Sequence, residues 1–166
     1  MNTLKLIPLV CALLNAACIP GIINRCSYAL SDEFVLTTND PEACNLANGI
    51  QVSLLHPHEK GMAPSADPAA MDSSQIFFYE CLDLELFDSY WLNGVPYIDF
   101  HQPAKGYKWW KSRNKEEFDT FTWEILPDRW YRIDGLQEGG ASIVTLFFMK
   151  TKNGVVTEKL VRVNNY

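Results

Sequence analysis

The sequence predicts a domain that is mostly antiparallel β-sheet with little helix. Strand-like segments recur along the chain, at residues 33–38, 49–55 and 75–82. The clearest pattern lies near the end, where the β-branched and aromatic run ASIVTLFFMK (141–150) is followed by VVTEKLVRV (155–163). Asn153 and Gly154 stand between the two runs. An Asn-Gly pair in this setting favours a tight antiparallel hairpin.

Weaker patterns complete the expected set of elements. In SYWLNGVPYIDF, Asn93 and Gly94 separate two apolar runs, which predicts a second hairpin, although Pro96 weakens it. In EFDTFTWEI (117–125), apolar residues alternate with polar ones, as in a half-buried strand. Two short helix signals lie near Asp83–Asp88 and within residues 66–74.

Residues 1–17 are predicted to be a cleavable secretory signal peptide. Lys5 precedes an apolar run, Leu6–Leu14, and small residues follow at Ala16 and Ala17. A charged start, a short apolar core and a small-residue exit are typical of such signals. The run is too short to cross about 30 Å of hydrocarbon, so we expect no membrane anchor. Cleavage would leave a single secreted domain, residues 18–166.

Cleavage after Ala17 leaves an even number of cysteines in an oxidising compartment. They are Cys18, Cys26, Cys44 and Cys81. We expect these four to form disulfides that staple the first half of the domain; three pairings are possible, and the sequence leaves them open. The alternative is a bacterial lipoprotein with Cys18 acylated, but Asn15 stands where such a signal normally has an aliphatic residue.

Charge is divided unevenly along the mature chain. Residues 18–99 carry two basic and twelve acidic residues, whereas residues 100–166 carry eleven basic and eight acidic ones. The basic half either complements the acidic half within one fold or forms a surface for anions. The net charge of −6 argues against strong non-specific binding to nucleic acid.

The most loop-like stretch is residues 56–74, which is longer than an ordinary connection. His56 and His58 lie at its start, and His101 is the only other histidine. No cysteine or glutamate spacing nearby completes a recognisable metal site. We therefore expect neither a metal nor another cofactor.

Four short motifs follow one another in the C-terminal half. They are YKW (107–109), TWEILP (122–127), GGASIV (139–144) and NGVVTEK (153–159). In this order they resemble the small secreted guanyl-specific ribonucleases of fungi. They are still more similar to the ribonuclease-like effectors of plant-pathogenic fungi, especially powdery mildews. The resemblance covers residues 106–163 and implies an α+β, ribonuclease-like fold, with a central antiparallel sheet packed on one short helix.

The resemblance also implies that catalysis is lost. Glu124 stands where the family has its catalytic glutamate, but Trp109, Ile143 and Glu158 stand where it has histidine, arginine and histidine. Cleaving RNA by internal transfer needs a base, an acid and cations for the developing charge. Such groups act as a unit. Glu124 is thus the single candidate catalytic residue of a ribonuclease-like pseudoenzyme.

The segment GYKWWKSRNK (106–115) interleaves aromatic and basic side chains. Such a segment can stack on bases and neutralise phosphates, or anchor a protein interface. The alternative is that its tryptophans belong to the core and its lysines keep the protein soluble. The candidate ligand-binding residues are Tyr107, Trp109, Trp110, Lys111 and Arg113.

Together these patterns predict a secreted fungal virulence effector that binds a host protein or RNA, either outside the host cell or after uptake into it. Two alternatives belong to other classes. One is a secreted hydrolase that uses carboxylates such as those of DLELFD (83–88). The other is an effector of an unrelated, disulfide-stapled β-sheet family that acts in the plant apoplast.

Secretion by a eukaryotic expression host tests the predicted cleavage of the signal peptide and the predicted disulfides. The protein recovered from the medium is expected to begin at Cys18 and to carry no reactive thiol unless it is first reduced. Amino-terminal sequencing and thiol alkylation followed by mass spectrometry measure both properties. An N-terminus at Met1, or a lipid on Cys18, would contradict this interpretation of the leader.

Overall fold

The computed structural model describes residues 27–39, 46–57, 64, 67–95, 97–112, 115–118, 124–136 and 142–160. The predicted signal peptide and three of the four cysteines expected to form disulfides, Cys18, Cys26 and Cys44, lie outside these residues.

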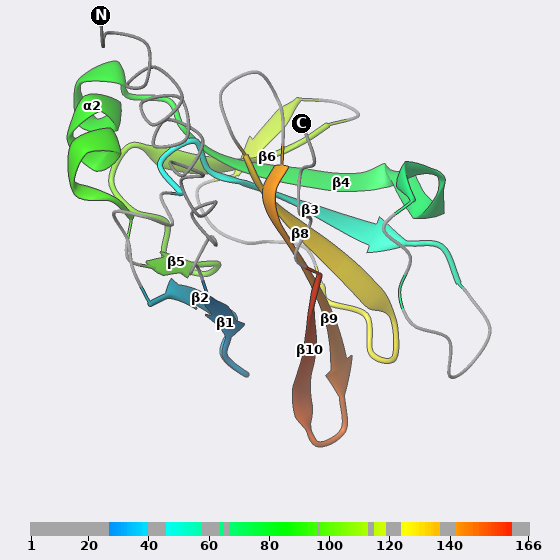
Figure 1. The fold of residues 1–166 in the computed structure, drawn as a ribbon. Coiled ribbons are helices and arrows are strands. Elements are labelled where there is room, and N and C mark those ends of the chain that lie inside the picture. The colour runs from blue at the N-terminus through cyan, green and yellow to red at the C-terminus, as the bar shows by residue number, and fades with distance from the viewer. Residues whose placement is uncertain are drawn as a thin grey trace, which may run out of the picture.

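Two antiparallel sheets make up the described fold (Figure 1). The larger has seven strands in the order β10-β9-β8-β3-β4-β6-β7, and the smaller has the order β1-β2-β5. The small sheet comprises β1 (Tyr28–Leu30), β2 (Val35–Thr38) and β5 (Tyr97–Asp99). The large sheet comprises β3 (Ile50–Leu55), β4 (Met71–Cys81), β6 (Tyr107–Lys111), β7 (Glu116–Phe118), β8 (Trp130–Leu136), β9 (Ser142–Thr151) and β10 (Gly154–Leu160). The expectation of a mostly antiparallel β protein is confirmed.

Strand β3 lies at the centre of the large sheet, paired with β4 on one side and β8 on the other. Its apolar residues Ile50 and Val52 are fully buried. Tyr79 of β4 lies opposite Ile50, and Ile133 of β8 lies opposite Val52. Since side chains alternate along a strand, these residues share one face of the sheet, which we call the core face.

The hairpin predicted at the end of the chain is confirmed. Strands β9 and β10 pair from Thr151 opposite Gly154 to Thr145 opposite Leu160. The hydroxyl of Thr151 accepts a hydrogen bond from the Asn153 amide at 3.1 Å and donates one to the Gly154 carbonyl at 3.0 Å. Gly154 has φ +120°, a conformation that L side chains rarely adopt.

Helix α2 (Leu84–Asn93) extends the first predicted helix signal by more than a turn. The Asp83 carboxylate caps it by accepting from the amides of Glu85 and Leu86, at 3.1 and 3.2 Å. Gly94 ends it with φ +74°. The hairpin expected at Asn93 and Gly94 is therefore wrong: this pair closes a helix, because the capped turn at Asp83 starts helical backbone that continues until a glycine allows it to stop.

Two other expected boundaries also differ. The helix signal within residues 66–74 is a single 3-10 turn, Pro68–Ala70, and β4 begins directly after it at Met71, so the long loop ends earlier than expected. Of the strand expected over residues 117–125, the described residues 117 and 118 belong to β7, whereas residues 124 and 125 have no regular structure. Residues 119–123 lie outside the described part of the chain.

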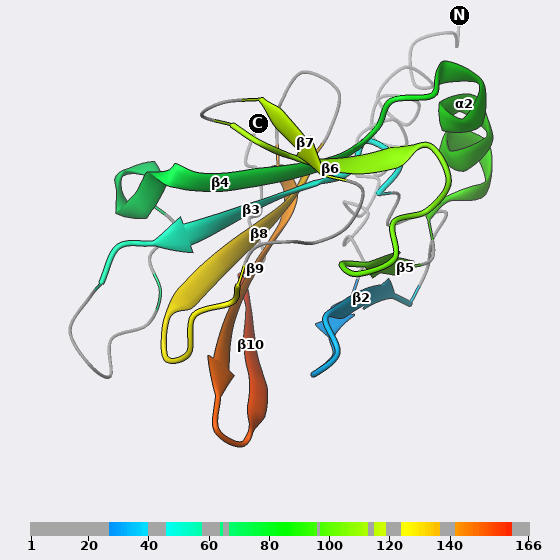
Figure 2. The same cartoon turned by 180° about the vertical axis from the view of Figure 1, so that it is seen from behind.

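The small sheet, rather than the helix, faces the middle of the core face. Phe34, in the β1–β2 turn, packs edge-on against Phe148 of β9, with ring centroids 6.0 Å apart. Phe100, just after β5, packs against Trp109 of β6 at 5.1 Å. Helix α2 lies at one end of β4, as Figures 1 and 2 both show. It packs there through Phe87, one of its half-buried side chains.

An unbroken series of aromatic contacts joins these three parts. Each ring in the series is within 6.2 Å, centroid to centroid, of the next. Its members, in order, are Tyr90, Tyr107, Tyr79, Trp109, Phe100, Phe34, Phe148 and Tyr131. We call this set the aromatic series.

Gly49, just before β3, provides a test of the sheet geometry. It has φ +87°, and a Cβ placed there would lie 1.8 Å from the Tyr79 carbonyl oxygen. Gly49→Ala should therefore destabilise the fold by more than about 3 kcal/mol, since rigid backbone stands in the way. Urea denaturation followed by tryptophan fluorescence measures the change.

Gly106→Ala is the matched control. Its φ is similar, +85°, but the nearest atoms to a Cβ there belong to side chains, at 3.0 Å or more. We expect a smaller cost, about 1–2 kcal/mol, from the positive φ and a slight shift of these side chains. Equal destabilisation by the two variants would contradict the close approach of β4 to Gly49.

Candidate functional site

The candidate site is the second face of the large sheet, opposite the core face. Alternation places on it those residues of β3, β4, β6, β8 and β9 that lie between the core residues. Its centre is polar but buried: Ser53, Arg132, Asp134 and Thr145 are each at most 5% exposed. We call this side the polar face.

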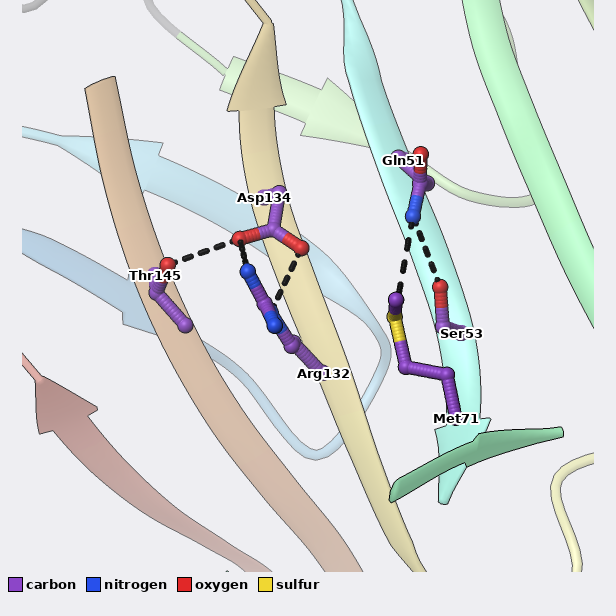
Figure 3. Close-up of polar contacts among 6 residues, drawn as sticks. All are labelled: Gln51, Ser53, Met71, Arg132, Asp134 and Thr145. Atoms are coloured by element: carbon purple, nitrogen blue, oxygen red, sulfur yellow. Dashed lines mark hydrogen bonds and ion pairs between the residues drawn. The ribbon is translucent and has the colours of Figure 1, made fainter. Parts of the chain in front are cut away.

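Arg132 and Asp134 form a two-point ion pair on β8 (Figure 3). The Arg132 Nε and Nη2 atoms lie 2.7 and 2.8 Å from the two carboxylate oxygens of Asp134. Thr145, opposite Asp134 on β9, donates its hydroxyl to the same carboxylate at 2.7 Å. Buried charges need such pairing, because an uncompensated charge in the interior costs several kcal/mol. The pair therefore neutralises itself within the sheet.

Strand β3 adds a second polar group beside this pair. The side-chain amide of Gln51 donates to the Ser53 hydroxyl at 3.0 Å and to the Met71 sulfur at 3.9 Å (Figure 3). Gln51 lies opposite Asp134, and Ser53 opposite Arg132, in the β3–β8 register. The polar centre thus continues from β9 across β8 to β3.

Half-buried aromatic side chains continue the polar face on β4 and β6. Trp110 stacks on Phe78, its cross-strand neighbour, with centroids 4.3 Å apart and ring planes at 14°. The Trp110 indole donates to the Glu80 carboxylate at 2.5 Å. Beyond it, Lys108 lies 3.5 Å from Glu117 of β7 in an exposed ion pair. This part combines a flat aromatic surface with charged groups of both signs.

Strand alternation divides the binding surface expected over residues 106–115. Tyr107 and Trp109 are 4% and 0% exposed and belong to the aromatic series, so their expected place in a ligand-binding surface is corrected. Burial raises the pKa of the Tyr107 phenol far above its ordinary value, and its hydroxyl donates to the Ala47 carbonyl at 2.7 Å. Of the five candidates, Trp110 is on the polar face.

The two remaining candidates, Lys111 and Arg113, are basic. Lys111 is half-buried, with its Nζ 5.4 Å from the centre of the Phe77 ring, which is a cation–π contact. Arg113 lies outside the described residues. Lys111 lies opposite Phe77 and so belongs to the core-face side of β6. The candidate set is therefore reduced, at its described positions, to Trp110, with Lys108 added.

The positions aligned with ribonuclease catalysis do not meet in one place. Trp109 points into the core from β6, whereas Glu158 is exposed on β10. Four strands separate β6 from β10 in the sheet order, a distance of about 24 Å at 4.8 Å per strand. Glu124 is exposed and precedes β8 in an irregular segment. Ile143 is on β9.

Cys81 is the one cysteine among the described residues. Its thiol donates to the Asp83 carbonyl at 3.3 Å, and burial raises the thiol pKa above its ordinary value. The disulfides expected for Cys18, Cys26, Cys44 and Cys81 remain a prediction, since the first three lie outside the described part.

No cluster of three or more His, Cys, Asp or Glu side chains with metal-binding geometry occurs among the described residues. His56 is described, whereas His58 is outside those residues. Within the same residues, no helix is both long enough and apolar enough to span a membrane.

Comparison of the chain with models of protein families, with curated proteins and with solved structures found no match in any of the three. The ribonuclease resemblance therefore rests on the four C-terminal motifs alone.

Sequence reasoning missed the polar centre formed by Arg132, Asp134 and Thr145. A sign of it is present in WYRIDGL, where Arg132 and Asp134 occupy alternate positions of an otherwise apolar strand and so share a face. The sequence of this strand alone could not indicate Thr145, because that residue lies on β9, opposite Asp134.

Removing one partner of the buried pair tests its role. Asp134→Leu should destabilise the protein by about 3–5 kcal/mol, because the Arg132 guanidinium loses its carboxylate. The double variant Arg132→Met, Asp134→Leu should recover most of that loss, since no charge remains buried. Urea denaturation measures both. If the double variant is as unstable as the single variant, an unpaired buried charge does not explain the loss of stability, and the proposed role of the ion pair is wrong.

Proposed function

We propose that this chain is a secreted, non-catalytic effector of a plant-associated fungus. Its C-terminal half carries a ribonuclease-like pattern, and its role is to bind a host macromolecule. The observation that supports this best is the internal pairing of the polar face, where the described ionisable groups at the centre bond to one another instead of facing a ligand.

Phosphodiester cleavage needs groups that are available to the substrate. A base must accept the 2′ proton, and cations must face the phosphate as charge develops. On the polar face the buried cation, Arg132, is held at two points by Asp134. The Glu80 carboxylate accepts the indole N–H of Trp110. These bonds favour a structural role for groups that a nuclease would use in chemistry.

The charges of the face favour a protein partner over RNA. Each described basic side chain on it stands next to a carboxylate: Arg132 beside Asp134, and Lys108 beside Glu117. A groove for RNA depends on cations that are free to neutralise phosphates. A flat aromatic pair such as Phe78 and Trp110, surrounded by charges of both signs, is typical of protein interfaces.

An RNA cleavage assay tests the absence of catalysis. The secreted protein is expected to leave a guanine-containing single-stranded RNA intact, because Glu124 is without the base, acid and cation set that the reaction needs. Denaturing gel electrophoresis of the RNA over several hours measures this. An active fungal guanyl-specific ribonuclease is the positive control.

The variant Glu124→Gln separates residual activity from contamination. Guanine-specific cleavage by the wild-type protein that this substitution abolishes would refute the pseudoenzyme. Cleavage that is equal in both proteins would point to a contaminating nuclease, and the assay would then be repeated on further purified protein until one of the two results is reached.

A further inference from the structure

Helix α2 has apolar residues on its inner and its outer side, yet none of its residues is buried. Six of its ten residues are large and apolar or aromatic: Leu84, Leu86, Phe87, Tyr90, Trp91 and Leu92. A surface helix usually has one apolar stripe, and a helix that is apolar on all sides is normally covered. Helix α2 exceeds a single stripe, because Leu92 stands among its polar residues.

The inner side of α2 already has its partners. Phe87 and Tyr90 are half-buried and pack against the core. The Tyr90 ring lies 5.1 Å from that of Tyr107, and its hydroxyl donates to the Lys105 carbonyl at 3.1 Å. These contacts fix which side of the helix points away from the domain.

The outer side exposes its apolar residues to a high degree. Leu84 and Leu92 are 80% and 78% exposed, and Trp91 is 46% exposed. Leu84 and Leu92 are eight residues apart, so they lie on the same side of the helix, separated by about 12 Å along its axis. We call these three residues the α2 patch.

The exposed apolar residues are also concentrated near α2. Seven large hydrophobic residues are exposed in the described part of the chain, and five of them fall between residues 82 and 97. The five are Leu82, Leu84, Trp91, Leu92 and Tyr97. Scattered single residues need no explanation, but a group of this kind marks an interaction surface.

Charge identifies the kind of partner. The segment from residue 82 to 97 contains Asp83, Glu85 and Asp88 and no lysine, arginine or histidine. Glu85 and Asp88 are exposed, and Asp88 lies between Leu84 and Leu92 on the outer side. An apolar surface bordered by carboxylates attracts basic groups and repels phosphates.

We propose that the α2 patch docks a segment of a host protein in which lysine or arginine residues stand beside aliphatic or aromatic ones. This inference rests on the proposed function and deepens it by naming the class of partner. The apolar side chains supply the buried contact area, and the carboxylates select for positive charge.

A library of random sixteen-residue peptides displayed on phage is the probe. Panning on the immobilised secreted protein is expected to enrich peptides that combine net positive charge with aliphatic or aromatic residues. Their affinity should fall at least about tenfold for the double variant Leu84→Gln, Leu92→Gln, because two exposed leucines lose their contact area. Fluorescence polarisation of the synthetic peptides measures the affinities.

Two further variants make the test specific. Val156→Gln changes a residue that is 46% exposed on β10, away from α2, and should leave the affinities unchanged. Glu85→Gln with Asp88→Asn keeps the apolar contacts but should weaken binding up to several-fold and reduce its salt dependence. Glutamine suits a helix, and all the altered side chains are exposed, so circular dichroism should show each variant folded.

Several results would overturn the proposal. No enrichment, enrichment of acidic peptides, or equal binding to wild type and the double leucine variant would each do so. A dimer in sedimentation velocity that the leucine variant dissociates would assign the patch to self-association. RNA binding that the leucine variant abolishes would assign it to nucleic acid. RNA cleavage, by contrast, would refute the proposed function without changing the peptide result.

Discussion

The aromatic series is the interaction on which the rest of the fold depends. It runs from α2 through the core face of the large sheet to the small sheet, so one set of contacts holds all three parts together. Offset and edge-on aromatic pairs each contribute about 0.5–1.5 kcal/mol beyond the area that they bury. The small sheet, whose strands β1 and β5 have only three residues each, is stable only through such packing.

Phe34 shows how strongly this packing constrains the chain. It has φ +60°, which a bulky residue adopts at a cost of about 1–2 kcal/mol. Its ring contacts Phe100, which follows β5 of the small sheet, and Phe148, which lies on β9 of the large sheet. Its carbonyl also accepts from the Phe100 amide at 3.2 Å. The strained backbone persists because these contacts place the ring where both sheets need it.

The same alternation that builds the core face determines what remains for binding. On β6 it sends Tyr107 and Trp109 inward and leaves Lys108 and Trp110 on the polar face. On β8 it turns Arg132 and Asp134 toward each other, which uses their charges inside the protein. The most exposed apolar side chains then belong to α2, at the end of the sheet. Binding through a helix at the edge is consistent with a sheet whose polar groups are engaged in holding it together.

The sequence by itself determined the secondary structure class, the C-terminal hairpin and the central strands β3 and β4. These depend on local patterns: β-branched runs, alternation, and a turn that needs glycine. The pair Trp109-Trp110 also carries a constraint that is local to the strand: neighbouring side chains point to opposite faces, so only one of the two tryptophans can face the core.

Only the tertiary structure decided which tryptophan that is, that Asn93 and Gly94 end a helix, and that Arg132, Asp134 and Thr145 form one buried group. The physical reason is the same in each case. A hairpin and a helix end both favour Asn-Gly, a strand has two equivalent faces until a partner layer covers one, and a cross-strand bond exists only once the register is set. These choices depend on contacts between residues far apart in the chain, such as Phe34 with Phe148 and Tyr79 with Trp109.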